Sequence, residues 1–169
     1  MKIREIILEI GDSPYAYGPL EPQAQPSKLD RLIDKIPVKM SNLSVRYKFA
    51  TESGIEYIVY LDPDTRDKQV GLSVAFAAID PKTGKATVDI TQTGDAPRIF
   101  STVYKIMRDY ISQHNPAFIT FTAKNSEPTR VRLYNLIARQ SSKWFPNYEK
   151  ALSKASMGAT IYKLVRATK

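Results

Sequence analysis

Three basic side chains share one face of a predicted helix near the C-terminus. Arg132, Arg139 and Lys143 are separated by seven and four residues, so a helical repeat brings them to the same side. The aromatic residues that follow directly are Trp144, Phe145 and Tyr148. Cations beside aromatic rings are typical of surfaces that bind nucleic-acid phosphates and stack bases. The pattern equally fits a solvated helix face beside core aromatics, and both interpretations stay open.

The amino-acid composition limits which other catalytic or metal-binding sites the protein could contain. The sequence has no cysteine and a single histidine, His114, so it offers neither a thiolate metal site nor a multi-histidine one. His114 lies at a predicted helix end, where interaction with the helix dipole accounts for it. No phosphate loop of the Gly-x-x-x-x-Gly-Lys-Ser/Thr type is present, which argues against nucleotide hydrolysis. We therefore predict no metal site.

Positive charge is concentrated in the C-terminal half. The 169 residues carry a net charge of +8. Residues 98–169 contain 13 Lys/Arg and 3 Asp/Glu, whereas residues 1–97 contain 12 and 14. The C-terminal half is therefore expected to attract a polyanion, a phosphorylated cofactor or an acidic protein.

Length and hydropathy set the general class. A chain of 169 residues with 43% hydrophobic residues is expected to form a single domain, 1–169, with a substantial core. No apolar run approaches the length of a membrane span, and residues 1–5 lack a signal-peptide core. We therefore expect a cytoplasmic protein with no membrane contact.

The stretch from residue 85 to residue 139 is expected to position the functional groups. A strand at 86–91 and a turn at 92–97 lead into an amphipathic helix at 98–114, whose apolar residues fall on one stripe. A buried strand at 117–123 is expected to lie parallel to the strand at 86–91 through a right-handed crossover. A second helix is expected from Glu127 to about Ser142.

The flanking segments complete the sheet. The expected elements are strands at 2–10, 43–51, 54–62, 69–79 and 160–166, a helix at 27–36, and turns at 52–54, 62–64 and 80–85. A proline-rich loop at 11–26 connects the first two elements and contains Tyr15 and Tyr17. It is either a functional loop or a surface arm packed by its own tyrosines.

This order predicts an α+β fold with a mixed, mostly antiparallel sheet, one central parallel βαβ pair and helices on both faces. It resembles the GNAT (Gcn5-related N-acetyltransferase) family, in which a meander leads into a strand, a pyrophosphate-binding turn, a helix, a splayed strand and a second helix. The resemblance covers roughly residues 40–167. Segments that also resemble uncharacterised GNAT-like bacteriophage proteins are Thr93–Val103, Ile119–Ala123 and Arg130–Tyr134.

The resemblance implies acetyl-coenzyme A as a cofactor. In the family's turn, small residues let backbone N–H groups approach the pyrophosphate, which rests on the helix N-terminus. Gly94 and Ala96 match this pattern, whereas Thr91 replaces a long polar residue. Asp95 places a negative charge near the phosphates and fits a helix cap equally well. The implied cofactor-binding residues are Thr93, Gly94, Asp95, Ala96, Arg98 and Arg130, with Arg132 as a further phosphate candidate.

The resemblance also implies a catalytic acid. Leu133-Tyr134 matches the family's Leu-Tyr, whose tyrosine often protonates the departing thiolate. A phenol with a pKa of about 10 is protonated at neutral pH and suits this role. Glu127 replaces the family's Asn, the following Gly-Phe is missing, and Tyr134 fits a core position too. Candidates for the base that accepts the amine proton are Glu52, Glu56, Asp62 and Asp64.

Two functions follow from these observations. The first is an acyl-coenzyme A-dependent N-acyltransferase that transfers an acetyl group directly to an amine of unknown size, with the thioester between strands 86–91 and 117–123. The second is a catalytically inactive GNAT-like phage protein that binds a host protein or nucleic acid through the basic face at Arg132, Arg139 and Lys143.

Overall fold

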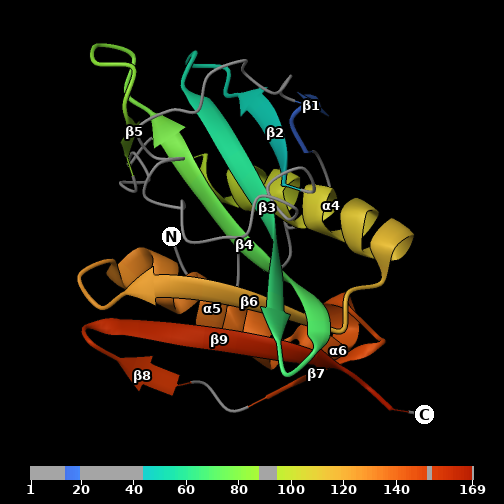
Figure 1. The fold of residues 1–169 in the computed structure, drawn as a ribbon. Coiled ribbons are helices and arrows are strands. Elements are labelled where there is room, and N and C mark those ends of the chain that lie inside the picture. The colour runs from blue at the N-terminus through green and yellow to red at the C-terminus, as the bar shows by residue number, and fades with distance from the viewer. Residues whose placement is uncertain (1–13, 20–43, 88–94, 152–153, 169) are drawn as a thin grey trace.

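A computed structural model describes residues 14–19, 44–87, 95–151 and 154–168. These residues form one mixed sheet with three helices (Figure 1). The strands are β1 (Tyr17–Pro19), β2 (Val45–Ala50), β3 (Glu56–Arg66), β4 (Gln69–Ile79), β5 (Ala86–Thr87), β6 (Phe118–Lys124), β7 (Tyr148–Lys150), β8 (Lys154–Ser156) and β9 (Ala159–Arg166). The helices are α4 (Ala96–His114), α5 (Pro128–Arg139) and α6 (Ser141–Trp144).

The strand order is β1-β2-β3-β4-β6-β9-β7, with β5 paired to β4 and β8 paired to β9. All pairs are antiparallel except β4 with β6. The predicted α+β class, with a mostly antiparallel sheet and one parallel pair, is confirmed. This element order is the one that the GNAT resemblance implied.

The antiparallel strands β2, β3 and β4 form a more regular meander than the sequence suggested. Strand β3 was expected to end at a turn over residues 62–64, and this prediction is wrong. The β3–β4 register continues to Arg66 and Gln69, where Asp67 and Lys68 form a two-residue turn with positive φ. Pro63 is tolerated because β2 ends opposite Leu61, so beyond that point β3 pairs only with β4 among the described residues.

The parallel pair involves a different strand from the predicted one. Strand β6 pairs with β4, not with the segment at 86–91, of which only residues 86–87 are described. Those two residues form β5, which pairs antiparallel with Ala78 and Ile79. The physical reason is the tight turn at 80–85, closed by an Asp80 N–H···O=C Lys85 bond of 2.9 Å, which folds the chain back onto β4.

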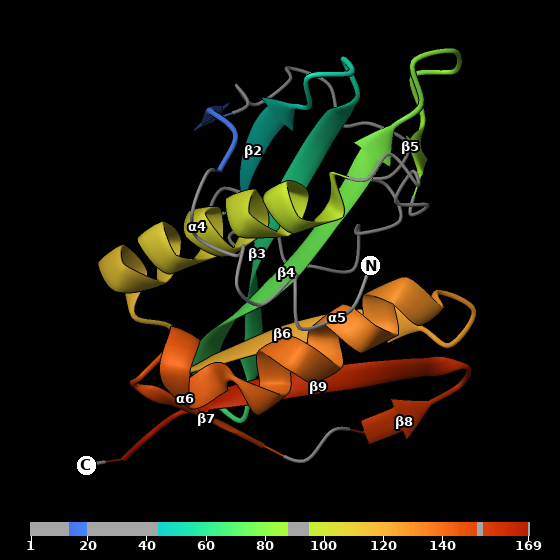
Figure 2. The ribbon, with the colours of Figure 1, turned by 180° about the vertical axis from the view of Figure 1, so that it is seen from behind.

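The described helices cover one face of the sheet (Figure 2). Helix α4 has Pro97 in its first turn and buries the apolar stripe predicted for residues 98–114. The predicted second helix is divided at Gln140 into α5 and the short α6. The strand expected at 2–10 and the helix at 27–36 lie outside the described residues. No helix in the described ranges is long and apolar enough to cross a membrane.

The sheet bends into two lobes that meet where β4 and β6 pair. The N-terminal lobe comprises β1 to β5 and α4, and the C-terminal lobe comprises residues 118–168 (Figure 1). At the junction, the Phe118 ring packs directly on Gly71, where an added Cβ would lie 2.3 Å from a ring carbon. Glycine is therefore required for this close approach of the two strands.

Part of the proline-rich segment is a strand. Residues 17–19 form β1, which pairs with β2 at the sheet edge. The Tyr15 ring stacks on Phe49 with centroids 6.0 Å apart, and the Tyr17 hydroxyl donates to Asp109 of α4 at 2.5 Å. The described part of the segment is therefore fixed to the sheet and to α4, in place of the structureless connection expected from its prolines.

Candidate functional site

The candidate cofactor site is the opening between β4 and β6. Their parallel register covers only Leu72–Val74 and Ile119–Phe121, after which the two strands diverge. Helices α4 and α5 both begin on the side of the molecule where the strands separate (Figure 2). This opening replaces the predicted cleft between strands 86–91 and 117–123.

Arg130 spans this opening. It lies in the first turn of α5 with 6% of its surface exposed. Its Nη2 donates to the Phe76 carbonyl of β4 at 2.8 Å, and the guanidinium lies 4.8 Å from the Phe76 ring centroid. Nη1 lies 3.7 Å from a carboxylate oxygen of Glu127. Arg130 therefore joins α5 to the diverging part of β4, and its charge is balanced within its own helix turn.

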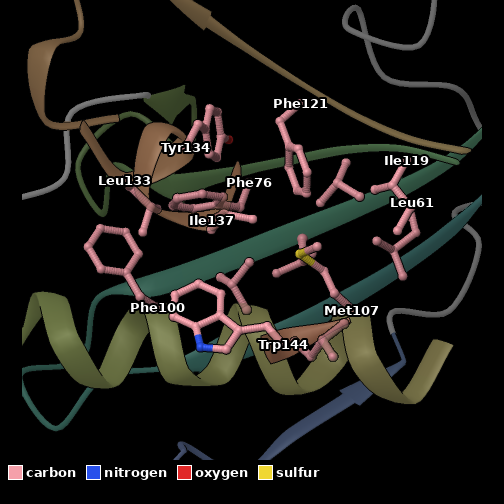
Figure 3. Packing of buried hydrophobic residues seen from close by; sticks show 14 of the residues in the cluster. Leu61, Phe76, Phe100, Met107, Ile119, Phe121, Leu133, Tyr134, Ile137 and Trp144 are labelled. Atoms are coloured by element: carbon pink, nitrogen blue, oxygen red, sulfur yellow. The ribbon is translucent and has the colours of Figure 1, made fainter. Parts of the chain in front are cut away.

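Tyr134 belongs to the core. It is 2% exposed and lies among the buried hydrophobic residues shown in Figure 3. Its ring packs against those of Phe121 and Tyr162, with centroids 5.3 and 5.8 Å away. Burial raises its pKa to about 12, while the nearby Arg130 charge lowers the pKa and the Glu127 charge raises it. The phenol is therefore protonated at neutral pH, as a catalytic acid must be, but it lies inside the protein.

The turn before α4 is only partly described. Thr91, Thr93 and Gly94 lie outside the described residues, and Ala96 is the first residue of α4. The Asp95 side chain makes no cap hydrogen bond, so the prediction of a carboxylate cap is wrong. Its backbone carbonyl instead accepts the Ile99 N–H at 3.0 Å. The carboxylate stays at the helix N-terminus, where it would repel a pyrophosphate.

The Arg98 guanidinium interacts with other side chains of the protein. It forms an ion pair with Glu52 in the β2–β3 turn, and its guanidinium lies 4.0 Å from the Tyr15 ring centroid. The Tyr15 backbone N–H donates to Thr102 at 2.9 Å and fixes the ring beside α4. Burial, followed by the Asp95 charge, raises the Tyr15 pKa. Arg98 thus ties the first turn of α4 to two neighbouring segments.

The candidate bases are not gathered at the opening. Glu52 pairs with Arg98, as described above. Because β3 alternates and its odd residues 57, 59 and 61 are buried towards the helices, Glu56, Asp62 and Asp64 belong to the opposite face. Glu56 pairs with Lys48 at 2.5 Å. The structure therefore separates these carboxylates from Tyr134.

Acetyl-coenzyme A does not fit the described part of this opening. Beyond the parallel register, β5 pairs with the edge of β4 at Ala78 and Ile79. Arg130 donates a hydrogen bond to the Phe76 carbonyl, so this backbone acceptor of β4 is already occupied. The apolar space left between the sheet and the helices has a volume of about 10 Å³, much smaller than a ligand pocket. Figure 3 shows the packed side chains around it. Residues lining this space include Phe76, Phe100, Phe121, Tyr134 and Trp144.

The three basic residues predicted to share one face of a single helix lie on two helices, Arg132 and Arg139 on α5 and Lys143 on α6, because the helix is divided at Gln140. We keep the name basic face for these three residues. Arg132, Arg139 and Lys143 are all exposed, and none of the ion pairs formed among the described residues involves them. The neighbouring rings are not open stacking platforms, because only 8% of Trp144 and 3% of Phe145 are exposed. Both pack against Tyr104, so the core interpretation of these aromatics is confirmed.

A groove that the sequence did not indicate lies beside this face. It has a volume of about 380 Å³ and separates the C-terminal half of α4 from α6 and β7. Its lining residues are Arg108, Ile111, Ser112, Asn115, Trp144, Phe145, Pro146, Asn147 and Tyr148. The two walls are about thirty residues apart in the chain, so no local spacing could have indicated the groove. Within the described ranges, no cluster of three or more His, Asp or Glu side chains could hold a metal ion.

Residues 34–150 match the sequence model of a protein family described as "Family of unknown function (DUF6934)". No curated protein matches the chain. Among solved structures, a mutant of the spermidine N-acetyltransferase SpeG from Vibrio cholerae is similar, with a TM-score of 0.48 and 10% identity over 88% of this chain and 92% of that chain. A chimera of SpeG from Vibrio cholerae and hSSAT gives 0.47 and 10% over 90% and 94%. Similarity at this level assigns no activity, and the phage resemblance stays a prediction.

Proposed function

Because this chain belongs to DUF6934, a family of unknown function, we propose its role from the geometry: it binds nucleic acid through the basic surface of the C-terminal lobe. The GNAT-like sheet serves as a scaffold for this surface and does not transfer acyl groups.

The observation that supports this proposal is an excess of positive charge that acidic side chains of the same lobe do not neutralise. Residues 118–168 contain nine Lys/Arg and two Glu. One glutamate, Glu127, is partly buried and paired with Arg130, which leaves Glu149 as the exposed acid of the described lobe. The exposed cations are Lys124, Arg132, Arg139, Lys143, Lys150, Lys154 and Arg166. Such a one-sided surface gains affinity from a polyanion through release of the polyanion's counterions.

A nucleic acid fits this surface better than an acidic protein. Stable protein interfaces need a core of aromatic and aliphatic side chains inside a polar rim. Over the described residues, the exposed large hydrophobic side chains are Val70 and Met157, which lie in different lobes. Interfaces with nucleic acids are more polar and more positively charged, as this surface is.

The second candidate function is transfer of an acetyl group from acetyl-coenzyme A to an amine. The observation that favours it is the protonated Tyr134 behind the diverging strands, flanked by the beginnings of two helices. For the coenzyme to enter, Arg130 must leave the Phe76 carbonyl. Isothermal titration with acetyl-coenzyme A tests this candidate. We expect no binding, whereas saturable binding that weakens in Tyr134→Phe would favour the acetyltransferase.

The proposed function is tested with a fluorescein-labelled single-stranded oligonucleotide of about twelve nucleotides, long enough for a single-domain site. The Arg139→Glu/Lys143→Glu variant reverses two exposed charges on the basic face. The matched control is Lys82→Glu/Lys85→Glu, which reverses two exposed lysines in the β4–β5 turn. We expect the first variant to weaken binding at least about tenfold and to flatten its salt dependence, and the control to change affinity by less than about threefold.

Fluorescence anisotropy at several salt concentrations measures both quantities. Absence of binding at low salt, or an equal loss in the control, would overturn the proposal. Far-ultraviolet circular dichroism of each variant confirms that the fold is retained, since all four positions are exposed.

A further inference from the structure

The groove between α4 and the α6–β7 segment is distinct from the opening between β4 and β6. Its lining residues come from the second half of α4, from α6, and from the chain up to the first residue of β7. It lies next to the basic face, because Lys143 precedes Trp144, which lines the groove. A volume of about 380 Å³ is within the range of small-molecule sites.

The floor of the groove is apolar and aromatic. Ile111 of α4 and the Trp144, Phe145 and Tyr148 rings are each less than a tenth exposed. The Tyr148 ring is held in place, because its hydroxyl donates to the Pro116 carbonyl at 2.6 Å. A flat, apolar ring system can therefore be desolvated there without rearrangement of the walls.

The rim is polar and positively charged. Ser112, Asn115 and Asn147 are exposed and line the groove, and the amide groups can pair with the donors and acceptors of a base edge. Arg108 also lines it, with 54% of its side chain exposed. A second guanidinium is adjacent, because Arg166 Nη1 donates to the Asn115 carbonyl at 2.9 Å.

None of the described residues that line the groove carries a carboxylate. Asp109 follows Arg108 in sequence, but its carboxylate accepts from the Tyr17 hydroxyl at 2.5 Å and from Lys105 at 2.9 Å on the β1 side of α4. Its distance of 3.7 Å from Arg108 Nε marks a weak exposed pair. The groove therefore combines an aromatic floor, amide groups and cations, which is the chemistry that recognises a nucleotide.

We propose that this groove holds one unstacked nucleotide of a single-stranded nucleic acid, with its base at the Asn115 and Asn147 amides and the small exposed part of Trp144, and its phosphate at Arg108. This inference rests on the proposed function and adds the strand type. A base inside a duplex cannot enter a groove enclosed by two walls, whereas a single strand can turn one base out of its stack. The neighbouring phosphates then follow the basic face of α6 and α5.

The protein carries its own reporter for this site. Trp144 is the single tryptophan of the chain and lines the groove. Titration of the full chain with dAMP is therefore expected to change tryptophan fluorescence saturably. Deoxyadenosine, which lacks the phosphate, is expected to bind about tenfold more weakly because it makes no charge-assisted contact with Arg108. Inorganic phosphate alone is expected to leave the fluorescence unchanged.

Two variants test the geometry. Ser112→Phe fills the groove from the exposed side of α4 and is expected to abolish the dAMP response. Arg108→Ala is expected to weaken dAMP about tenfold while leaving deoxyadenosine within about twofold. The control is Lys85→Ala, which removes an exposed cation of the N-terminal lobe and is expected to change neither ligand.

The outcomes separate this inference from the function on which it rests. If the labelled oligonucleotide binds but dAMP causes no fluorescence change, or if Ser112→Phe retains the response, the groove assignment fails and the proposed function stands. If neither probe binds, both fail. If duplex and single-stranded oligonucleotides bind equally and Ser112→Phe affects neither, the single-strand assignment is overturned. Matched ribo- and deoxyribo-oligonucleotides then identify which sugar the groove prefers.

Discussion

The described residues of the two lobes contain the same number of Lys and Arg side chains, but the lobes differ in how many of these cations are paired with acidic side chains. The described residues of the N-terminal lobe contain nine Lys/Arg and eight Asp/Glu, whereas the C-terminal lobe contains nine and two. Ion pairs of the N-terminal lobe include Lys48–Glu56, Arg66–Asp64, Arg98–Glu52 and Lys105–Asp109. In the described C-terminal lobe the ion pair is Arg130–Glu127, in which Arg130 is buried and Glu127 is partly buried.

This difference separates charge that serves the fold from charge that is available to a partner. In the N-terminal lobe, cations attach turns and β1 to the sheet and to α4, as Arg98 and Lys105 do. In the C-terminal lobe, the exposed cations extend from α5 across α6 to β9 without acidic partners in the described residues. A count of Lys and Arg alone would not reveal this contrast, since the described residues of each lobe contain nine; the number of acidic residues and the ion pairs make the difference.

The largest expected effect concerns the buried pair of the C-terminal lobe. Arg130→Ala leaves the partly buried Glu127 without its cation and the Phe76 carbonyl without its donor. We expect the free energy of unfolding to fall by about 3–5 kcal/mol. Urea denaturation measures the loss. The double variant Arg130→Met/Glu127→Gln removes both charges and is expected to be more stable than Arg130→Ala. Equal stability of the two variants would contradict the buried-pair account.

A second prediction concerns alkaline stability. Because the folded-state pKa of Tyr134 is raised to about 12, the folded protein retains a proton that the unfolded chain loses above about pH 10. Its stabilising contribution is therefore complete below pH 10 and disappears as pH rises through 12, a loss of about 2–3 kcal/mol. Tyr134→Phe should show a smaller decrease between pH 10 and 12 in chemical denaturation. An unchanged decrease would mean that Tyr134 is less buried than described.

The lobe junction gives a third prediction. Gly71→Ala places a Cβ 2.3 Å from the Phe118 ring and should destabilise the protein by about 1–3 kcal/mol. The Phe118→Leu change removes ring atoms from the contact, so the double variant should recover part of the loss relative to Phe118→Leu alone. Thermal unfolding of the four proteins in the cycle measures the coupling. Additive effects would show that the two residues are not in contact.

The smallest expected effect compares single lysines of the two lobes. Lys48→Ala removes an exposed pair with Glu56 and should cost less than about 1 kcal/mol, decreasing as salt is added. Lys143→Ala should leave stability unchanged within about 0.5 kcal/mol, because this exposed lysine pairs with no described acid. Denaturation at low and high salt distinguishes them. A larger loss in Lys143→Ala would reveal a structural role for the basic face.

Most elements were predictable because their signals are local. The apolar stripe of α4 depends on positions three and four residues apart, and the alternation of β9 on neighbouring residues. The continuation of β3 through Pro63 was not predictable, because it depends on β2 ending opposite Leu61. For the site, the sequence located Arg130 and Tyr134 on the correct helix but could not show that both are buried.

By itself, the sequence determined the order and type of most elements, the absence of cysteine chemistry, and the concentration of positive charge in the C-terminal half. Only the tertiary structure decided that β6 pairs with β4, that Arg130 spans the opening between them, and that a groove forms beside Trp144. The physical reason is distance along the chain. Periodicity and composition are properties of neighbouring residues, whereas strand partners, the hydrogen bond from Arg130 to Phe76 and the groove arise from contacts between segments that the sequence separates by tens of residues.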